Sequence, residues 1–549
     1  MQRRDFIRLG ATGLTAALTG TAAANEPSAA GTAAQAPTAP PAVPPFELDE
    51  ATIADLQKKM SEGALTARQV AERYLARIEA IDREGPALNS VIELNPDALA
   101  IADALDRERK EKGARGRLHG IPVLVKDNID TADRMRTSAG SLALAESITP
   151  RDAFVVERMR AAGAVILGKT NLSEWANFRS MRSTSGWSGR GGQTRNPYAL
   201  DRNPCGSSSG SGTAASANLC AAAIGTETDG SIVCPSNASG LVGIKPTVGL
   251  VSRSGIVPIS VSQDTAGPMA RTVADAAALL TAIAAVDPRD RATTRQARRA
   301  APDYTTFLDP GGLRGARLGV VRKMFGRNER VQGLTEAAID ALKQQGAAII
   351  DPVVLTTQGK FDDAEFEVLL YEFKDGLNTY LASLGATVPV RSLGELIAYN
   401  EAHREREMPF FGQGIFIDAQ KKGPLTTPAY LEARAACRRL SRTLGIDALL
   451  AKHRLDALVA PTGDPAFLID HVNGDHFTGG GASTPSAVAG YPHVTVPMGF
   501  VSGLPVGLSF MGGAWSEPTL ITLAYAYEQA TKQRKAPTFA GSAQTGFGL

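Results

Sequence analysis

The sequence predicts an α/β protein whose sheet is covered by helices on both faces. Two short runs of branched apolar residues, 121–125 and 164–167, have the length and composition of buried strands. A helical pattern over 152–162 separates them, and the same alternation returns between residues 316 and 350. Because strands that are buried on both faces occur in sheets that helices cover on both sides, the alternation favours this fold class.

Composition and charge exclude several classes of protein. The 549 residues are 43% hydrophobic and 21% charged, which is ordinary for a globular protein with a sizeable core. The 58 basic and 56 acidic residues give a formal charge of +2, and no basic stripe stands out. Nucleic acid is therefore not an expected partner.

The four cysteines are Cys205, Cys220, Cys234 and Cys437. They have neither the spacing of zinc ligands nor the density of a disulfide-stapled scaffold. We interpret them as small buried residues, and an oxidised pair is the lesser alternative. Their spacing does not indicate which two would pair.

Residues 1–24 resemble an export signal rather than part of the fold. Arg3 and Arg4 precede Asp-Phe-Ile, a weakly apolar stretch runs over 9–19, and alanines at 22–24 provide a small-residue cleavage site. Paired arginines in this context are typical of the twin-arginine signal of bacteria. Because the apolar stretch is short and rich in Gly, Thr and Ala, we expect no stable membrane anchor and a periplasmic or secreted protein.

The rest of the chain divides into a linker and one large domain. Residues 25–45 are rich in Ala, Pro, Thr and Gly and cannot build a core. We expect a single domain over 46–540. Within it the stretch 360–445 is mainly helical, and we interpret it as an excursion from the sheet rather than a separate domain, because strands resume after it.

Helices and strands alternate along this domain. The first clear helix starts at Thr66 with a capping box, and a second follows Pro96. After the helical excursion, strands resume at 457–460, and two more are expected between residues 493 and 510. The final predicted helix covers 518–532.

Small polar residues are concentrated in two adjoining loops. The run CGSSSGSG at 205–212 leads into an Ala-rich segment, 213–223, which we interpret as a helix, and a loop at a helix N-terminus presents free amide hydrogens. A flexible linker would not run straight into buried-looking structure, and a phosphate-binding loop would need a Lys after Gly212. The next segment, 225–235, is turn-rich and can present Ser231 together with backbone amides.

These loops contain no histidine that could act as the base for a serine nucleophile. The six histidines all lie elsewhere; they are His119, His403, His453, His471, His476 and His493. Lys126 is the other candidate, because it follows the apolar strand 121–125 and burial would favour its neutral form. The alternative is an ordinary solvated lysine at the end of a strand.

Several ordered motifs resemble the amidase signature family. They are PVLVKDNID around Lys126, GSSSGSG around Ser207, TETDGSIVCPS around Ser231, and the following GLVGIKPTVGLVSRSGIVPIS. More narrowly, GKTNLSEWANF, GWSGRGGQTRNPY and AGYPHVTVPMG are similar to the bacterial peptide amidases. The likeness covers the chain from about residue 50 to residue 535.

The resemblance implies a fold and a catalytic triad. The fold is a large mixed, twisted sheet of many strands between helices, with a smaller helical region beside the active site. Ser231 would be the nucleophile, Ser207 the bridging proton relay and Lys126 the general base. The resemblance implies no metal and no organic cofactor.

The resemblance also implies the surroundings of the nucleophile. The backbone amides of Thr228, Asp229, Gly230 and Ser231 would form the oxyanion hole. The peptide bond between Gly206 and the bridging serine would be cis. Such a bond before a residue other than proline is rare, so this expectation is a specific one.

Substrate choice depends on the narrower resemblance. Peptide amidases remove the C-terminal amide of peptides, and Trp175, Asn177, Trp187 and Gln193 lie in loops that match this subfamily. The alternative for the aromatic residues is core packing, for example of Trp175 against Phe178. The expected partner is a small-molecule or peptide amide.

Three other functions stay open at this point. A general short-chain or aryl amidase would use the same triad with a different pocket. The glutamine-hydrolysing subunit of a tRNA-dependent amidotransferase shares the signature, but the predicted export signal argues against a cytosolic complex. A non-enzymatic binding protein would have little reason to keep Lys126, Ser207 and Ser231 together.

Overall fold

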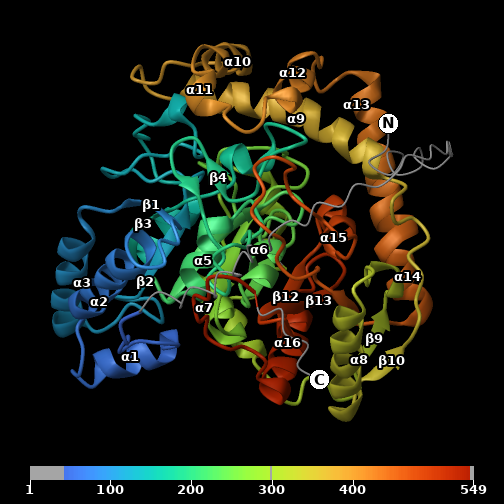
Figure 1. Ribbon diagram of the computed structural model, residues 1–549. Coiled ribbons are helices and arrows are strands. Elements are labelled where there is room, and N and C mark those ends of the chain that lie inside the picture. Colours follow the sequence, from blue (N-terminus) through green and yellow to red (C-terminus); the bar gives the residue numbers. More distant parts are fainter. Residues whose placement is uncertain (1–42, 297–298, 544–549) are drawn as a thin grey trace, which may run out of the picture. The chain divides into compact units, whose positions relative to one another are not determined.

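An eleven-stranded mixed sheet runs through the computed structural model, which describes residues 43–296 and 299–543 (Figure 1). In spatial order the strands are β1 (Val91–Leu94), β3 (Val165–Thr170), β2 (Pro122–Lys126), β6 (Ala222–Glu227), β8 (Thr265–Ala270), β7 (Val242–Lys245), β12 (His493–Val501), β13 (Leu504–Met511), β11 (Ala457–Pro461), β9 (Arg317–Val320) and β10 (Ala348–Ile350). β2 is parallel to both of its neighbours, β3 and β6. The predicted fold class, a large mixed sheet with helices, is confirmed.

The described residues form one compact unit. They all fall within the unit that spans residues 39–549. The predicted export signal, 1–24, and the linker as far as residue 42 lie outside the described residues. Within the described ranges, no helix has the length and apolar character needed to cross a bilayer.

Helices connect the strands along the chain. In order they are α1 (Ile53–Ser61), α2 (Ala67–Arg77), α3 (Ala98–Lys112), α4 (Phe154–Ala161), α5 (Ser209–Ser216), α6 (Val233–Ala238), α7 (Val273–Ile283), α8 (Glu329–Gln344), α9 (Asp362–Ser383), α10 (Leu393–Ala402), α11 (Arg404–Glu407), α12 (Gly414–Gln420), α13 (Pro428–Arg438), α14 (Asp447–His453), α15 (Ser483–Ala489) and α16 (Glu517–Thr531). The predicted helix at Thr66 is α2, and Thr66 forms the expected reciprocal capping bonds with Gln69. The sequence interpretation missed α1, although Thr52 and Asp55 form a second capping box in front of it.

One predicted helix is wrong in part. α5 ends at Ser216, and Ala222 and Ala223 belong to β6 rather than to the helix expected over 213–223. β6 pairs with β2 on one side and with β8 on the other. These long-range pairings outweigh the helix preference of alanine, which is small for each residue.

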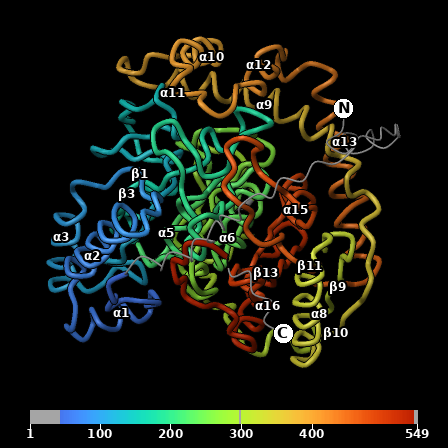
Figure 2. The backbone as a smooth tube through the Cα atoms, in the orientation of Figure 1, coloured from blue at the N-terminus to red at the C-terminus, as the bar shows by residue number. Residues whose placement is uncertain are grey.

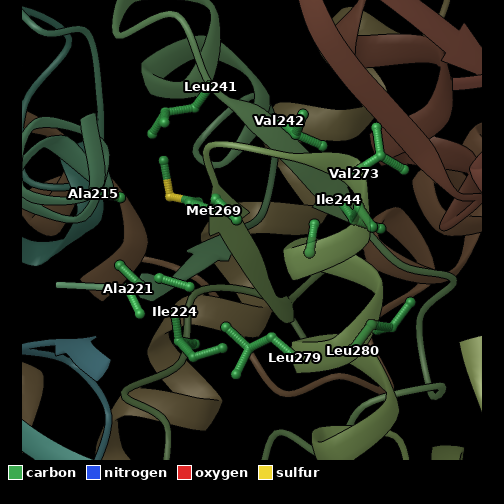
Figure 3. Packing of buried hydrophobic residues seen from close by; sticks show 14 of the residues in the cluster. Ala215, Ala221, Ile224, Leu241, Val242, Ile244, Met269, Val273, Leu279 and Leu280 are labelled. Atoms are coloured by element: carbon green, nitrogen blue, oxygen red, sulfur yellow. The ribbon is translucent and has the colours of Figure 1, made fainter. Parts of the chain in front are cut away.

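The core packs against the middle of the sheet. In Figure 3, Ile224 of β6 lies next to Leu279 of α7, and both side chains are fully buried. Burial of an apolar side chain of this size contributes about 2 kcal/mol relative to exposure. This packing anchors β6, the strand that leads to Ser231.

The chain returns to the middle of the sheet near its C-terminal end (Figure 2). β12 pairs antiparallel with β7, and Thr495 lies opposite Gly243. α15 precedes β12, and its first residue, Ser483, lies beside Gly230: a Cβ atom placed on Gly230 would be 3.2 Å from the Ser483 hydroxyl. A late segment of the sequence therefore contacts the loop after β6.

The helices from α9 to α13 form the gold and orange region of Figure 1. α9 contacts α10, α12 and α13. Phe373 of α9 stacks on Phe416 of α12 with ring centroids 5.3 Å apart, and Trp175 meets Phe416 edge-on at 6.0 Å. An apolar cluster thus joins this helical region to the loop that contains Trp175.

Candidate active site

Lys126 is buried at the end of β2. Because β2 and β6 are parallel neighbours and Val125 lies opposite Ile224, the ends of the two strands lie side by side. The Lys126 ammonium nitrogen lies 2.8 Å from the Ser207 hydroxyl, 2.9 Å from the Thr226 hydroxyl and 3.3 Å from the Thr226 carbonyl oxygen. The side chain is fully buried, so the alternative of a solvated lysine is wrong.

Burial changes the ionisation of Lys126. Loss of hydration disfavours the ammonium form and lowers the pKa of Lys126 to about 7, although the carboxylates of Glu227 and Asp264 act in the opposite direction. A substantial fraction of Lys126 is therefore neutral near neutral pH. A neutral amine beside a hydroxyl can accept a proton, whereas an ammonium cannot.

Ser207 lies in the turn that starts α5. The peptide bond between Gly206 and Ser207 is cis, as the resemblance predicts. The carbonyl oxygen of Ser207 accepts a hydrogen bond from the N–H of Ser173 at 3.1 Å. A Cβ atom on Gly206 would collide with the Ser173 hydroxyl, so a larger residue at this position would have to displace Ser173.

Ser231 lies in the loop between β6 and α6. Its carbonyl oxygen accepts from the N–H of Ser208 at 3.2 Å, so this loop touches the Ser207 loop directly. Gly230, with φ of +80°, makes the turn before it in a conformation that favours glycine. Within the described residues no hydrogen bond joins the hydroxyls of Ser207 and Ser231, so the structure brings Lys126 and Ser207 into contact and places Ser231 beside them.

The four amides predicted to form the oxyanion hole are free of protein acceptors. Across the described chain, none of the N–H groups from Thr228 to Ser231 has a hydrogen-bond acceptor. The loop is held by other groups: the Thr228 hydroxyl donates to Asp264 at 2.6 Å, and Glu227 accepts from the N–H groups of Ile232 (2.7 Å) and Val233 (3.0 Å). Fixed amides without partners can stabilise a developing negative charge.

A disulfide bond joins the two loops. Cys205 and Cys234 are linked with their Cα atoms 5.9 Å apart, which corrects our interpretation of all four cysteines as unpaired buried residues. Cys220 and Cys437 are buried free thiols, as expected. Cysteine density could not reveal a single bond between residues 29 positions apart, because the pairing depends on how the two loops meet.

The predicted substrate-side residues have different environments. Trp175 is buried in an apolar cluster that also contains Phe178, which supports the core interpretation for this ring. Trp175, Ala176 and Asn177 all have positive φ, between +50° and +68°, so this segment is not a right-handed helix. Gln193 is hydrogen-bonded to the His471 ring at 3.0 Å.

A cavity of about 480 Å³ adjoins the Lys126 site. Thr226 and Thr228 line it on the sheet side, the apolar segment 256–259 forms a second wall, and α9 contributes Glu372 and Gly376. Its volume lies within the range of small-molecule sites, which is about 300–1,000 Å³. Thr226, the partner of Lys126, was missed by sequence reasoning, because only the pairing of β2 with β6 brings the two residues together.

Comparison with known proteins agrees with this geometry. A family model described as amidase matches residues 69–521. A probable amidase of Arabidopsis thaliana is 45% identical over 504 residues, which cover 90% of this chain and 92% of that protein. A glutamyl-tRNA(Gln) amidotransferase subunit of Chloroflexus aurantiacus is 36% identical over 504 residues, or 88% of this chain and 98% of that protein.

The structural comparison points to the same family. The native peptide amidase of Stenotrophomonas maltophilia has a TM-score of 0.87 and 56% sequence identity, and the match covers 90% of this chain and 100% of that one. The region matched by the family model contains both serine-rich loops and the strand that ends at Lys126. The chain therefore belongs to the amidase signature family and is a hydrolase that acts on amide C–N bonds.

Proposed function

We propose that the protein hydrolyses the C-terminal carboxamide of peptides through Ser231, Ser207 and Lys126. The observation that carries the triad is the 2.8 Å contact between the buried Lys126 amine and the Ser207 hydroxyl. The next residue in the chain, Ser208, donates its N–H to the carbonyl oxygen of Ser231. The similarity to a peptide amidase supports the choice of substrate.

The hydrogen bonds around Lys126 suggest how it acts as the base. A neutral amine has two N–H donors and one lone pair. The carbonyl oxygen and the hydroxyl of Thr226 can accept the two N–H groups, which leaves the lone pair directed at the Ser207 hydroxyl. Asn128 also donates to the Thr226 hydroxyl at 3.0 Å and holds it in place.

In the first half of the reaction, Lys126 takes the proton of Ser207, and Ser207 takes the proton of Ser231. The Ser231 oxygen attacks the carboxamide carbon, and the amides from Thr228 to Ser231 stabilise the oxyanion of the tetrahedral intermediate. The proton returns through Ser207 to the amide nitrogen, the C–N bond breaks, and ammonia leaves an acyl group on Ser231.

In the second half, water takes the place of ammonia. The relay of Ser207 and Lys126 removes a proton from the water, which attacks the acyl carbon, and the carboxylic acid leaves when Ser231 regains its proton. The two steps replace one difficult displacement. The adjoining cavity has an apolar wall over 256–259 and charged side chains such as Arg253 and Glu372 elsewhere in its lining, so it offers both apolar and polar contacts to a peptide chain, whereas ammonia as the leaving group needs little space.

A substrate panel tests this function. We would incubate the purified protein with a blocked dipeptide amide, the matching peptide that ends in asparagine with a free carboxylate, and benzamide, and follow each product by mass spectrometry. Conversion of the C-terminal amide alone is the expected result. Faster conversion of benzamide would assign the protein to the general amidases instead.

We further infer that residues 1–24 direct export by the twin-arginine route. The paired Arg3 and Arg4 and the following small-residue site support this. In cells, Arg3→Lys/Arg4→Lys should leave the protein in the cytosol, whereas the unchanged chain should reach the periplasm. Equal periplasmic amounts of the two proteins would contradict the inference.

A further inference from the structure

We propose that the Cys205–Cys234 disulfide positions the proton relay, so that turnover depends on this bond while the fold does not. The proposal rests on the proposed roles of Ser207 and Ser231 and adds a requirement to them. Cys205 precedes Ser207 by two residues, and Cys234 follows Ser231 by three. The bond therefore links the two loops that must exchange a proton.

Besides the disulfide, hydrogen bonds of Ser208 hold these loops near each other: its hydroxyl donates to the Thr226 carbonyl oxygen at 3.0 Å and accepts from the Thr226 N–H at 3.1 Å, just before the Ser231 loop. Among the described residues, one hydrogen bond joins 205–208 to 228–234, the 3.2 Å bond from the Ser208 N–H to the Ser231 carbonyl oxygen. That bond fixes the backbones near one another, but within the described residues no hydrogen bond joins the two hydroxyls directly. The disulfide supplies a second, covalent connection across the same gap, with Cα atoms 5.9 Å apart.

Each cysteine is coupled to its catalytic neighbour by short contacts. The Cys205 N–H donates to the side chain of Asn203 at 2.9 Å, and its carbonyl oxygen accepts from the Ser209 hydroxyl at 2.7 Å, so the residues on both sides of Ser207 are held. The Cys234 N–H donates to the carbonyl oxygen of Gly230 at 2.8 Å. A displacement of Cys234 would therefore move the turn that presents the oxyanion amides.

The fold has other supports. The segments that flank the loops, β6 and α5, are buried, and β6 is paired on both sides. Cys205 is only 4% exposed, but Cys234 is partly exposed, so a small reductant can reach the bond. Dithiothreitol supplies two electrons and two protons, the S–S bond breaks to give two thiols, and the reagent closes to its cyclic disulfide.

The test compares the oxidised protein, the protein reduced by dithiothreitol, and the double variant Cys205→Ser/Cys234→Ser. Cys220→Ala is the matched control, since Cys220 is a fully buried free thiol before the opposite end of β6. We measure kcat and KM on a blocked dipeptide amide, circular dichroism, and kcat against pH. Loss of the Cys205–Cys234 bond should reduce kcat on the order of 10-fold to 100-fold, because a small misplacement of reacting groups has an effect of this size.

The expected pattern distinguishes positioning from folding. KM, the circular dichroism spectrum and the pH midpoint of kcat should stay unchanged, because the cavity and the surroundings of Lys126 are intact. Reoxidation of the reduced protein should restore kcat, and Cys220→Ala should behave like the unchanged protein. A double variant with unchanged kcat, or a loss of kcat that parallels a loss of folded protein, would overturn the proposal. Failure of the oxidised protein on every amide would instead refute the proposed function.

Discussion

Replacement of Lys126 by methionine should inactivate the enzyme and stabilise its fold. Lys126→Met keeps the approximate volume of the buried side chain but removes the amine that contacts Ser207. Without the general base, kcat should fall on the order of 10²-fold to 10⁴-fold. The same change removes the cost of holding an ionisable group without water.

The size of the stabilisation follows from the pKa of Lys126. In the unfolded chain this group stays protonated up to its ordinary pKa of 10.5, whereas in the folded protein it loses its proton near pH 7. A difference of this size destabilises the folded state by about 5 kcal/mol below pH 7 and by about 4 kcal/mol at pH 7. The hydrogen bonds lost to Ser207 and Thr226 offset about 1–2 kcal/mol of that gain. We expect Lys126→Met to be more stable by about 2–3 kcal/mol at pH 7.

The pH dependence of unfolding provides the assay. Between about pH 7 and pH 10 the unfolded state of the unchanged protein binds more protons than the folded state, so its stability rises with pH. The methionine variant does not gain this contribution, so the difference between the two proteins should shrink as the pH rises. Urea unfolding at several pH values measures this difference. A variant that is less stable at pH 7, or a difference that stays constant with pH, would refute the assignment of Lys126 as a buried neutral base.

Three further outcomes test the site. With the unchanged enzyme, kcat/KM should rise with pH through a midpoint near 7 and then level off, because neutral Lys126 is the active form; a profile that falls through this range would contradict its role. Ser231→Ala should bind the peptide amide without releasing ammonia, and no acyl-enzyme should be detected by mass spectrometry of the intact protein; an acylated variant would identify another nucleophile. Gly206→Ala should lose about 1–3 kcal/mol of stability and most activity, because the added carbon meets Ser173. Gly385→Ala, where nothing lies within 4 Å, is its control, and equal behaviour of the two variants would show that the close packing at Gly206 is unimportant.

Strong local patterns made much of the fold predictable. The branched runs at 121–125 and 457–460 became β2 and β11, and the capping box at Thr66 marks the start of α2. β7 and β8 escaped prediction, because their sequences VGIK and TAGPMA contain Gly, Pro and Ala, which carry little strand preference. Their place in the sheet is set by pairing with strands far away in the chain.

The candidate site was likewise predictable only in part. The serine-rich loops and Lys126 were identified from motifs that are continuous in the sequence. The contact of Lys126 with Thr226 and the bond between Cys205 and Cys234 were not, since each joins segments that only the folded chain brings together. The local sequence identified the reactive groups but did not show which of them lie close together in the folded chain.

The parallel pairing of β2 and β6 has a consequence for how activity develops during folding. Side chains alternate between the faces of a strand, so a slip of one residue in this pairing would turn Lys126 away from Ser207. Parallel neighbours are not joined by a tight hairpin, and their alignment depends on the long connection between them. Turnover thus reports the correct register of the central sheet, and during refolding it should recover after the far-ultraviolet signal of helices and strands has returned.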